Sequence, residues 1–307
     1  MEYVITASGL SKKYMKVRAV DELNIKVPKG AIYGLVGKNG AGKTTFMRVI
    51  TGLTEPSGGA YSLYGVENGD KEILKVRRRI GAMVDKPFLY KDMTVRGNLK
   101  QQRILYGVLS KEIVDEVIKL VGLEKVARKK VGKLSLGMRQ RLGIAMALVG
   151  SPDLLILDEP INGLDPQGVI ELRELLLKLN REKQTTILIS SHILGELSKP
   201  ATHYGFIHNG KIIKEISAAE LEMSMDKCVE VEVSDTMLLS RALDKLGKKY
   251  EIMSNTTARI YGELTATEVF KALDGENCEI ISMNNINRMD ANLENYFINL
   301  VGGGQYE

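Results

Sequence analysis

Hydrophobic residues along the first 217 positions fall into short blocks, and their spacing predicts strands that alternate with helices. Apolar runs of about four to eight residues are typical of buried strands, whereas apolar residues three or four positions apart are typical of helices. Because strands that alternate with helices favour a mostly parallel sheet, this part is expected to be α/β. Predicted strands cover residues 3–7, 24–27, 32–36, 60–64, 80–84, 154–157 and 185–190, and a hairpin covers 206–208 and 211–216.

The stretch from about residue 86 to 150 has a helical pattern, and we expect a helical subdomain there. Its clearest helix ends at Gly122, because glycine commonly follows the last helical residue. Another helix is predicted after Asp165, which is placed as its N-cap with Pro166 at the first helical position. The apolar stripe of the helix before Gly122 consists of Ile113, Val114, Val117, Ile118 and Val121.

The pattern changes after about residue 217. Strand-like runs at 228–233, 250–253, 257–262 and 278–283 enclose helical runs near 236–246 and 265–274. This β-α-β-β-α-β order is typical of a ferredoxin-like fold. We therefore expect an N-terminal domain over residues 1–217 and a small α+β accessory domain over residues 226–307.

Composition and charge narrow the class of protein without naming its partner. The chain has 44% hydrophobic and 26% charged residues, as ordinary soluble proteins do. It has neither an apolar run of membrane-spanning length nor a secretory signal pattern at its start. Residues 1–219 hold 35 basic against 22 acidic residues, whereas residues 220–307 hold 8 against 16. The basic part suits a nucleotide, an anionic membrane surface or a nucleic acid, so charge alone does not decide.

A glycine-rich loop joins the predicted strand 32–36 to a predicted helix. Two glycines separated by four residues, followed by Lys and Thr, form the pattern of a phosphate-binding loop. Glycines let backbone N–H groups approach a phosphate at a helix N-terminus. Lys43 is expected to reach the β- and γ-phosphates, and the Thr44 hydroxyl to bind Mg²⁺. The residues expected to bind a nucleoside triphosphate are Gly37, Lys38, Asn39, Gly40, Ala41, Gly42, Lys43, Thr44 and Thr45.

Polar side chains also follow two later predicted strands. Asp158 and Glu159 come directly after strand 154–157, and His192 comes shortly after strand 185–190. Ligands of open α/β sheets bind at the carboxyl ends of the strands. We therefore expect Asp158 to hold Mg²⁺ and Glu159 to orient or deprotonate a water. On the same rim, His192 is expected to contact the γ-phosphate, although a lone histidine is more often structural.

Together these motifs resemble the ATP-binding subunit of an ABC transporter over roughly residues 1–217. Residues 134–138, Leu-Ser-Leu-Gly-Met, are similar to the family signature, and Gly163-Leu164-Asp165 is similar to the D-loop. Asp158 and Glu159 match the Mg²⁺ and catalytic-glutamate strand, and His192 matches the switch histidine. The resemblance implies a P-loop NTPase fold of ABC type that uses ATP and Mg²⁺ and hydrolyses the ATP.

The resemblance also implies a head-to-tail dimer with a second copy or with a homologous ATPase. In such a dimer, Ser135 and Gly137 contact the ATP that the partner subunit holds. Tyr14 on its own would be interpreted as a packed surface tyrosine, but it falls where the family has an adenine-stacking aromatic residue.

Two departures from the family pattern matter. The signature carries Leu136 and Met138 where the family normally has Gly and Gln. Asp85 stands at the position of the Q-loop glutamine, where the resemblance implies a contact with Mg²⁺ and the hydrolytic water. The alternative is that Asp85 only shapes the turn before Pro87. An acidic residue there, with a short C-terminal extension, resembles the bacitracin- and lantibiotic-resistance ATPases of bacteria.

That resemblance implies a cytoplasmic subunit, peripheral on the inner face of the cell membrane. It would power export of a peptide antibiotic or similar substrate through a separately encoded integral membrane permease. Phe88, Leu89, Tyr90 and Met93 could receive a coupling helix of this permease or could simply pack in the core.

The alternative function is a soluble ABC-type ATPase that acts on ribosomes or nucleic acid. Such proteins carry two cassettes or a long coiled coil, and neither pattern is present in the sequence. We therefore expect no nucleic-acid partner. A metabolite kinase, the third function considered, would not explain the signature.

Overall fold

The computed structural model describes residues 2–85, 87–192, 200–224, 228–261, 266–273, 278–285, 296–297 and 300–301. The chain divides into two units. One comprises Met1–Ala218 together with Tyr296–Glu307, and the other comprises Ala219–Asn295. Among the described residues, none of the helices combines the length and the apolar character needed to cross a membrane.

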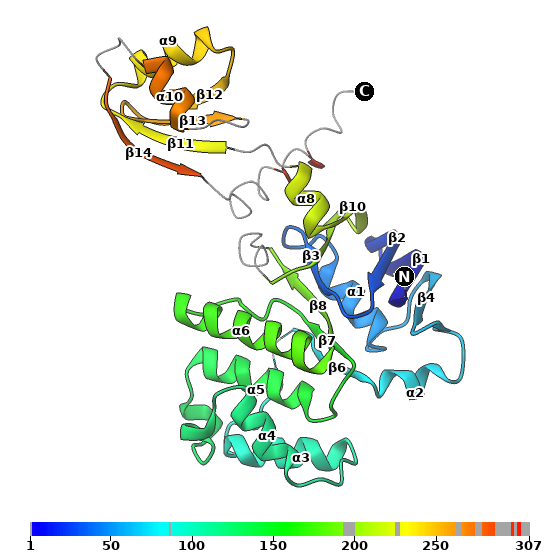
Figure 1. Ribbon diagram of the computed structural model, residues 1–307. Coiled ribbons are helices and arrows are strands. Elements are labelled where there is room, and N and C mark those ends of the chain that lie inside the picture. The colour runs from blue at the N-terminus through cyan, green and yellow to red at the C-terminus, as the bar shows by residue number, and fades with distance from the viewer. Residues whose placement is uncertain are drawn as a thin grey trace. The chain divides into compact units, whose positions relative to one another are not determined.

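A six-stranded sheet runs through the larger unit in the order β10-β9-β3-β8-β7-β6 (Figure 1). Neighbouring strands from β9 to β6 are parallel, and only β10 runs antiparallel to its neighbour. Every residue of β3, β7 and β8 is buried, which explains why these strands read as nearly unbroken apolar runs. The α/β fold expected from the sequence is confirmed. The strands are β3 (Ile32–Val36), β6 (Ile80–Met83), β7 (Leu154–Leu157), β8 (Thr186–Ser191), β9 (His203–His208) and β10 (Lys211–Ser217).

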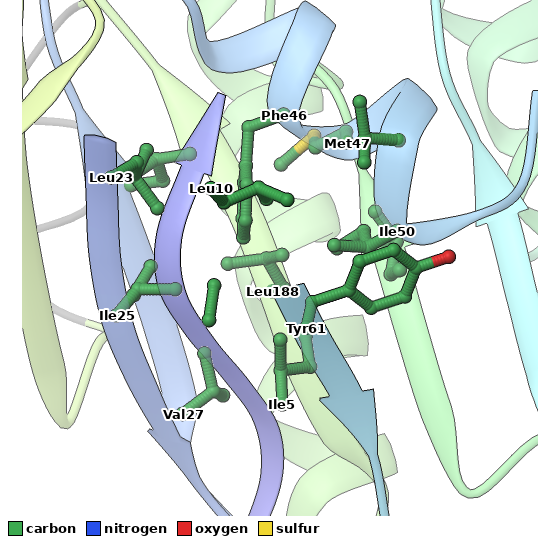
Figure 2. Close-up of a cluster of buried hydrophobic side chains, with 14 of the residues drawn as sticks. Ile5, Leu10, Leu23, Ile25, Val27, Phe46, Met47, Ile50, Tyr61 and Leu188 are labelled. Atoms are coloured by element: carbon green, nitrogen blue, oxygen red, sulfur yellow. The ribbon is translucent and has the colours of Figure 1, made fainter. Parts of the chain in front are cut away.

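A second, antiparallel sheet has the order β2-β1-β4-β5. It consists of β1 (Tyr3–Tyr14), β2 (Val17–Pro28), β4 (Gly58–Leu63) and β5 (Val66–Glu67). Its apolar face packs against helix α1 (Lys43–Ile50), whose Phe46, Met47 and Ile50 are fully buried (Figure 2). Leu188 of β8 joins the same cluster. Truncating a buried phenylalanine typically costs about 3–5 kcal/mol, so this core holds α1, and the loop that precedes it, firmly in place.

Helices α3 (Val95–Leu105), α4 (Ile113–Leu120) and α5 (Leu136–Leu148) pack on one another (Figure 1). Two short 3-10 helices, Glu124–Val126 and Val131–Lys133, connect α4 to α5. The side chains of Thr94 and Ser135 cap α3 and α5 by accepting a backbone N–H three residues on. Two helices lie outside this group, α2 (Ile73–Arg77) and α6 (Pro166–Lys183). Asp165 caps α6, as the sequence predicts.

Helix α8 (Ala218–Ser224) precedes the smaller sheet, whose order is β12-β13-β11-β14. All of its strand pairs are antiparallel. Val229, Val231 and Ile260 from its central strands form a buried core with Leu239 and Leu243 of α9. The order of elements and of strands confirms the predicted ferredoxin-like arrangement. The elements are β11 (Cys228–Val233), α9 (Thr236–Lys245), β12 (Lys249–Ile252), β13 (Thr257–Tyr261), α10 (Ala266–Leu273) and β14 (Ile280–Asn285).

Candidate nucleotide site

The residues of the candidate site lie at the carboxyl ends of four adjacent parallel strands, β3, β8, β7 and β6. The glycine-rich loop follows β3, His192 follows β8, Asp158 and Glu159 follow β7, and Asp85 follows β6 by two residues. Because these strands are neighbours in the sheet, segments that are up to about 150 residues apart in sequence meet at one rim.

The loop of residues 37–45 needs glycine at two positions where the chain packs too closely for a side chain. A Cβ on Gly37 would lie 2.4 Å from the Ile207 carbonyl oxygen, and one on Gly42 would lie 2.3 Å from that of Ala19. Gly42 also has a φ of 109° and stands at the N-cap of α1, so no side chain caps this helix. The first N–H groups of α1 thus have no side-chain acceptor, and such a helix start suits an anionic ligand. Lys38, Asn39 and Gly40 form the exposed tip of the loop.

Lys43 lies almost buried beneath this loop, with only 6% of its surface exposed. Its Nζ donates hydrogen bonds to the carbonyl oxygens of Gly37, at 2.5 Å, and Lys38, at 3.2 Å. The same ammonium forms an ion pair with Glu159, at 3.2 Å from Oε1. The ammonium group is thus held by charge-assisted contacts at the base of the loop.

Asp158 and Thr44 form the part of the site that fits a hard divalent cation. The Thr44 hydroxyl donates to Asp158 Oδ2 at 2.7 Å, and Asp158 is 5% exposed. A hydroxyl and a carboxylate are the oxygen donors that Mg²⁺ prefers. Within the described residues, no group of three or more His, Cys, Asp or Glu could hold a metal ion by itself.

Glu159 lies between Lys43 and His192. His192 Nδ1 is 2.7 Å from Glu159 Oε2, and Lys43 Nζ approaches Oε1. Glu159 has a φ of 46°, an unusual value for a residue other than glycine, two residues beyond the end of β7. The three side chains expected to act on the terminal phosphate are therefore brought together.

Asp85 lines a cleft together with Asp158 and Glu159. Its carboxylate is paired with a residue that the sequence patterns did not single out. Arg48 donates to Asp85 Oδ2 from Nε, at 3.1 Å, and from Nη2. This cleft has a volume of about 1190 Å³, and its lining includes Thr44, Asp158 and Glu159 as well as Arg48 and Asp85.

Tyr14 ends β1 and keeps 41% of its surface exposed. The Lys12 ammonium lies 5.1 Å from the centre of its ring. The pKa of the Arg48 guanidinium is raised, mainly by its hydrogen bond to Asp85 and to a smaller extent by the Tyr14 hydroxyl.

The signature residues stand at the start of α5 and interlock with the D-loop. A Cβ on Gly163 would lie 2.7 Å from Leu136 Cδ2, and one on Gly137 would lie 3.2 Å from Leu164 Cδ2. Within the described part of the chain, Ser135 and Gly137 make no hydrogen bond to the loop of residues 37–45. Leu136 and Met138, the two departures from the family pattern, remain 47% and 37% exposed.

Ser190 is a site residue that the motifs did not reveal. It is fully buried, and its hydroxyl donates to Asp158 Oδ1 at 2.6 Å. The Ser190 hydroxyl oxygen also accepts a hydrogen bond from the Glu159 N–H at 2.9 Å. A hydroxyl in an otherwise apolar central strand was the available signal, because buried polar groups are nearly always hydrogen-bonded. Arg48 gave no such signal, since an arginine on a helix is usually solvated.

Comparison with known proteins supports the motif reading. The sequence model of the ABC transporter family matches residues 20–162. The chain is 42% identical to the bacitracin transport ATP-binding protein BcrA of Bacillus licheniformis, over 99% of both chains. It is also 42% identical to the lantibiotic transport ATP-binding protein SrtF of Streptococcus pyogenes, over 69% of this chain and 90% of SrtF.

Among solved structures, a dimeric ATP-binding cassette, MJ0796, bound to ADP and Pi is similar to this chain with a TM-score of 0.64 and 25% identity. The match covers 70% of this chain and 98% of the cassette.

Proposed function

The chain belongs to the ABC transporter family as an ATP-binding, ATP-hydrolysing subunit, and we propose that it powers export of a peptide antibiotic or a similar substrate. The observation that carries the proposal is the meeting of Lys43, Asp158, Glu159 and His192 at one rim of the sheet, in a chain related over its full length to a bacitracin transport protein. In this proposal, residues 1–217 form the ATP-binding domain, with a helical subdomain over about 86–150. Residues 226–307 form an accessory domain.

In the proposed site, the loop of residues 37–45 binds the ATP phosphates through its backbone N–H groups, and Tyr14 stacks on the adenine. Lys43 leaves Glu159 and the Gly37 carbonyl and binds the β- and γ-phosphates. Thr44 and Asp158 hold Mg²⁺, with Asp85 as a further ligand. When bound, this ion neutralises charge on the phosphates.

Glu159 is the proposed general base. Once Lys43 has turned to the phosphates, Glu159 Oε1 is free to accept a proton from the attacking water, while Oε2 remains oriented by His192. His192, which contacts Glu159 Oε2, is the residue proposed to contact the γ-phosphate. Ser190 fixes the Glu159 backbone and the Asp158 carboxylate at the same time, so the base and the metal ligand keep a constant separation.

A second ATPase subunit completes the site in this proposal. Ser135 and Gly137 make no hydrogen bond to their own phosphate-binding loop among the described residues, and the similar cassette MJ0796 is dimeric with bound ADP and Pi. We therefore assign Ser135 and Gly137 to ATP held by the partner subunit in a head-to-tail dimer. The partner is a second copy or a homologous ATPase.

The proposed membrane partner is a separately encoded permease, which holds this subunit on the inner face of the cell membrane. Phe88 is 80% exposed and stacks edge-on against Tyr90 at 5.6 Å between ring centres. Core packing therefore does not account for Phe88, and an exposed aromatic pair next to Asp85 favours docking of another protein. A soluble ATPase that acts on ribosomes or nucleic acid is not favoured by the bacitracin and lantibiotic transport relatives.

The substrate class can be tested in the bacterium that encodes the chain. Deleting the gene should lower resistance to bacitracin or to a lantibiotic. The wild-type gene should restore the resistance, but the Glu159→Gln variant, expressed at the same level, should not. Unchanged sensitivity to every peptide antibiotic tried would refute the substrate class. It would leave the ATPase assignment standing, because turnover of the purified protein tests that separately.

A further inference from the structure

Arg48 and Asp85 form an ion pair in the cleft that Thr44, Asp158 and Glu159 also line. Arg48 lies on α1, six residues after its N-cap, and Asp85 lies beyond the end of β6, so the pair joins segments 37 residues apart. Both guanidinium donors converge on one carboxylate oxygen, Oδ2. The two side chains are 44% and 47% exposed, so neither is locked in place by burial.

The backbone of Asp85 is held at the proposed metal site even though its side chain is turned to Arg48. Its N–H donates to Asp158 Oδ2 at 3.4 Å, the same oxygen that accepts the Thr44 hydroxyl. Asp85 has a φ of 61°, a left-handed conformation that aspartate tolerates better than most residues. Because side chains move between discrete staggered rotamers, the carboxylate can change partner while this backbone stays fixed.

We propose that Arg48 is a positioning residue that holds the Asp85 carboxylate away from the Thr44–Asp158 pair until Mg²⁺ and ATP bind. This inference rests on the proposed function, because it takes Asp85 as a ligand that approaches the metal. A guanidinium and a divalent cation compete for the same carboxylate. Binding of the cation therefore has to break the ion pair, and Arg48 weakens the apparent affinity of the site for metal.

The competing interpretation is an ordinary surface ion pair, which contributes little and has no effect on metal binding.

The test is equilibrium binding of Mn²⁺, a substitute for Mg²⁺, measured by electron paramagnetic resonance in the presence of ATP. All variants carry Glu159→Gln so that ATP is consumed only slowly during the measurement. Because an exposed ion pair is typically weak, Arg48→Ala should tighten Mn²⁺ binding by only about two- to fivefold. Arg48→Lys, which keeps the charge but loses the planar fork, should lie between Arg48→Ala and the parent.

Two controls separate competition for the carboxylate from a general effect of charge. Arg79→Ala removes another exposed ion pair, the one with Asp153 at 2.7 Å, outside the residues that line the cleft, and should leave Mn²⁺ binding unchanged. In an Asp85→Asn background, Arg48→Ala should no longer tighten binding, because no carboxylate remains to be released.

Either of two results would overturn the inference. One is unchanged Mn²⁺ affinity in Arg48→Ala, which would leave an ordinary surface ion pair. The other is an equal gain in the Asp85→Asn background, which would mean that removing a positive charge acts on the metal directly. If the parent itself binds neither ATP nor Mn²⁺, the proposed function fails rather than the role of Arg48.

Discussion

Replacing Ser190 with alanine should damage stability and catalysis together, because one hydroxyl oxygen supports both carboxylate residues of the site. The variant leaves the Glu159 N–H without its acceptor and Asp158 Oδ1 without its donor, in a strand position with no exposed surface. A buried polar group that loses its partner costs about 1–3 kcal/mol. With two such groups, we expect the free energy of unfolding to fall by roughly 2–6 kcal/mol.

Urea unfolding of wild type and variant gives this free energy, and ATP turnover is measured on the same preparations. The matched control is Ser62→Ala, which removes one hydroxyl contact, with Thr6 at 2.8 Å. This contact lies in the sheet formed by β1, β2, β4 and β5. It should cost only about 0.5–1.5 kcal/mol and leave turnover unchanged. Turnover of Ser190→Ala should fall at least about tenfold, which corresponds to 1.4 kcal/mol in the barrier. Equal losses of stability in the two variants, with normal turnover in both, would refute the role given to Ser190.

Three further outcomes follow from the same geometry. Ser135→Arg should abolish turnover while ATP still binds the monomer normally in equilibrium dialysis; lost binding would place Ser135 in its own subunit's pocket. Gly163→Ala, with a φ of 76° and a Cβ 2.7 Å from Leu136 Cδ2, should unfold more easily than Gly107→Ala, with a φ of 66° and open space around it. Equal urea midpoints would mean that Leu136 yields freely. Asp85→Ala should lower Mg²⁺-dependent ATPase activity, assayed with the membrane partner, about tenfold or more, and Asp85→Gln should recover part of it. Wild-type activity in Asp85→Ala would leave Asp85 as a turn residue.

Much of the fold was predictable because apolar spacing and motifs carry it locally. The strand 228–233 and the order of elements in the ferredoxin-like part followed from alternation alone. Strands β1 and β2 were predicted too short, as residues 3–7 and 24–27, because their paired outer halves are partly exposed and the turn at Met15, with a φ of 51°, has no glycine. Tyr14 is therefore the last residue of β1 and does not lie in a loop between the two strands.

The site shows the same division between local and long-range information. Lys43, Thr44, Asp158 and Glu159 belong to short motifs whose spacing encodes their chemistry. Arg48 was out of reach, because its partner lies 37 residues away and no local pattern joins them. The pairing of Asp85 with Arg48 is a tertiary contact, which a single sequence does not specify.

ATP turnover by the purified Glu159→Gln variant tests the central claim most directly. The amide keeps the size of the side chain but does not accept a proton from water, whereas Lys43, Thr44 and Asp158 are untouched. We expect wild type to hydrolyse ATP in the presence of Mg²⁺. The variant should still bind ATP, but its turnover should be about 100 to 10,000 times slower. A variant that hydrolyses ATP at the wild-type rate would contradict the assignment of Glu159 as the catalytic base, and with it the proposed mechanism.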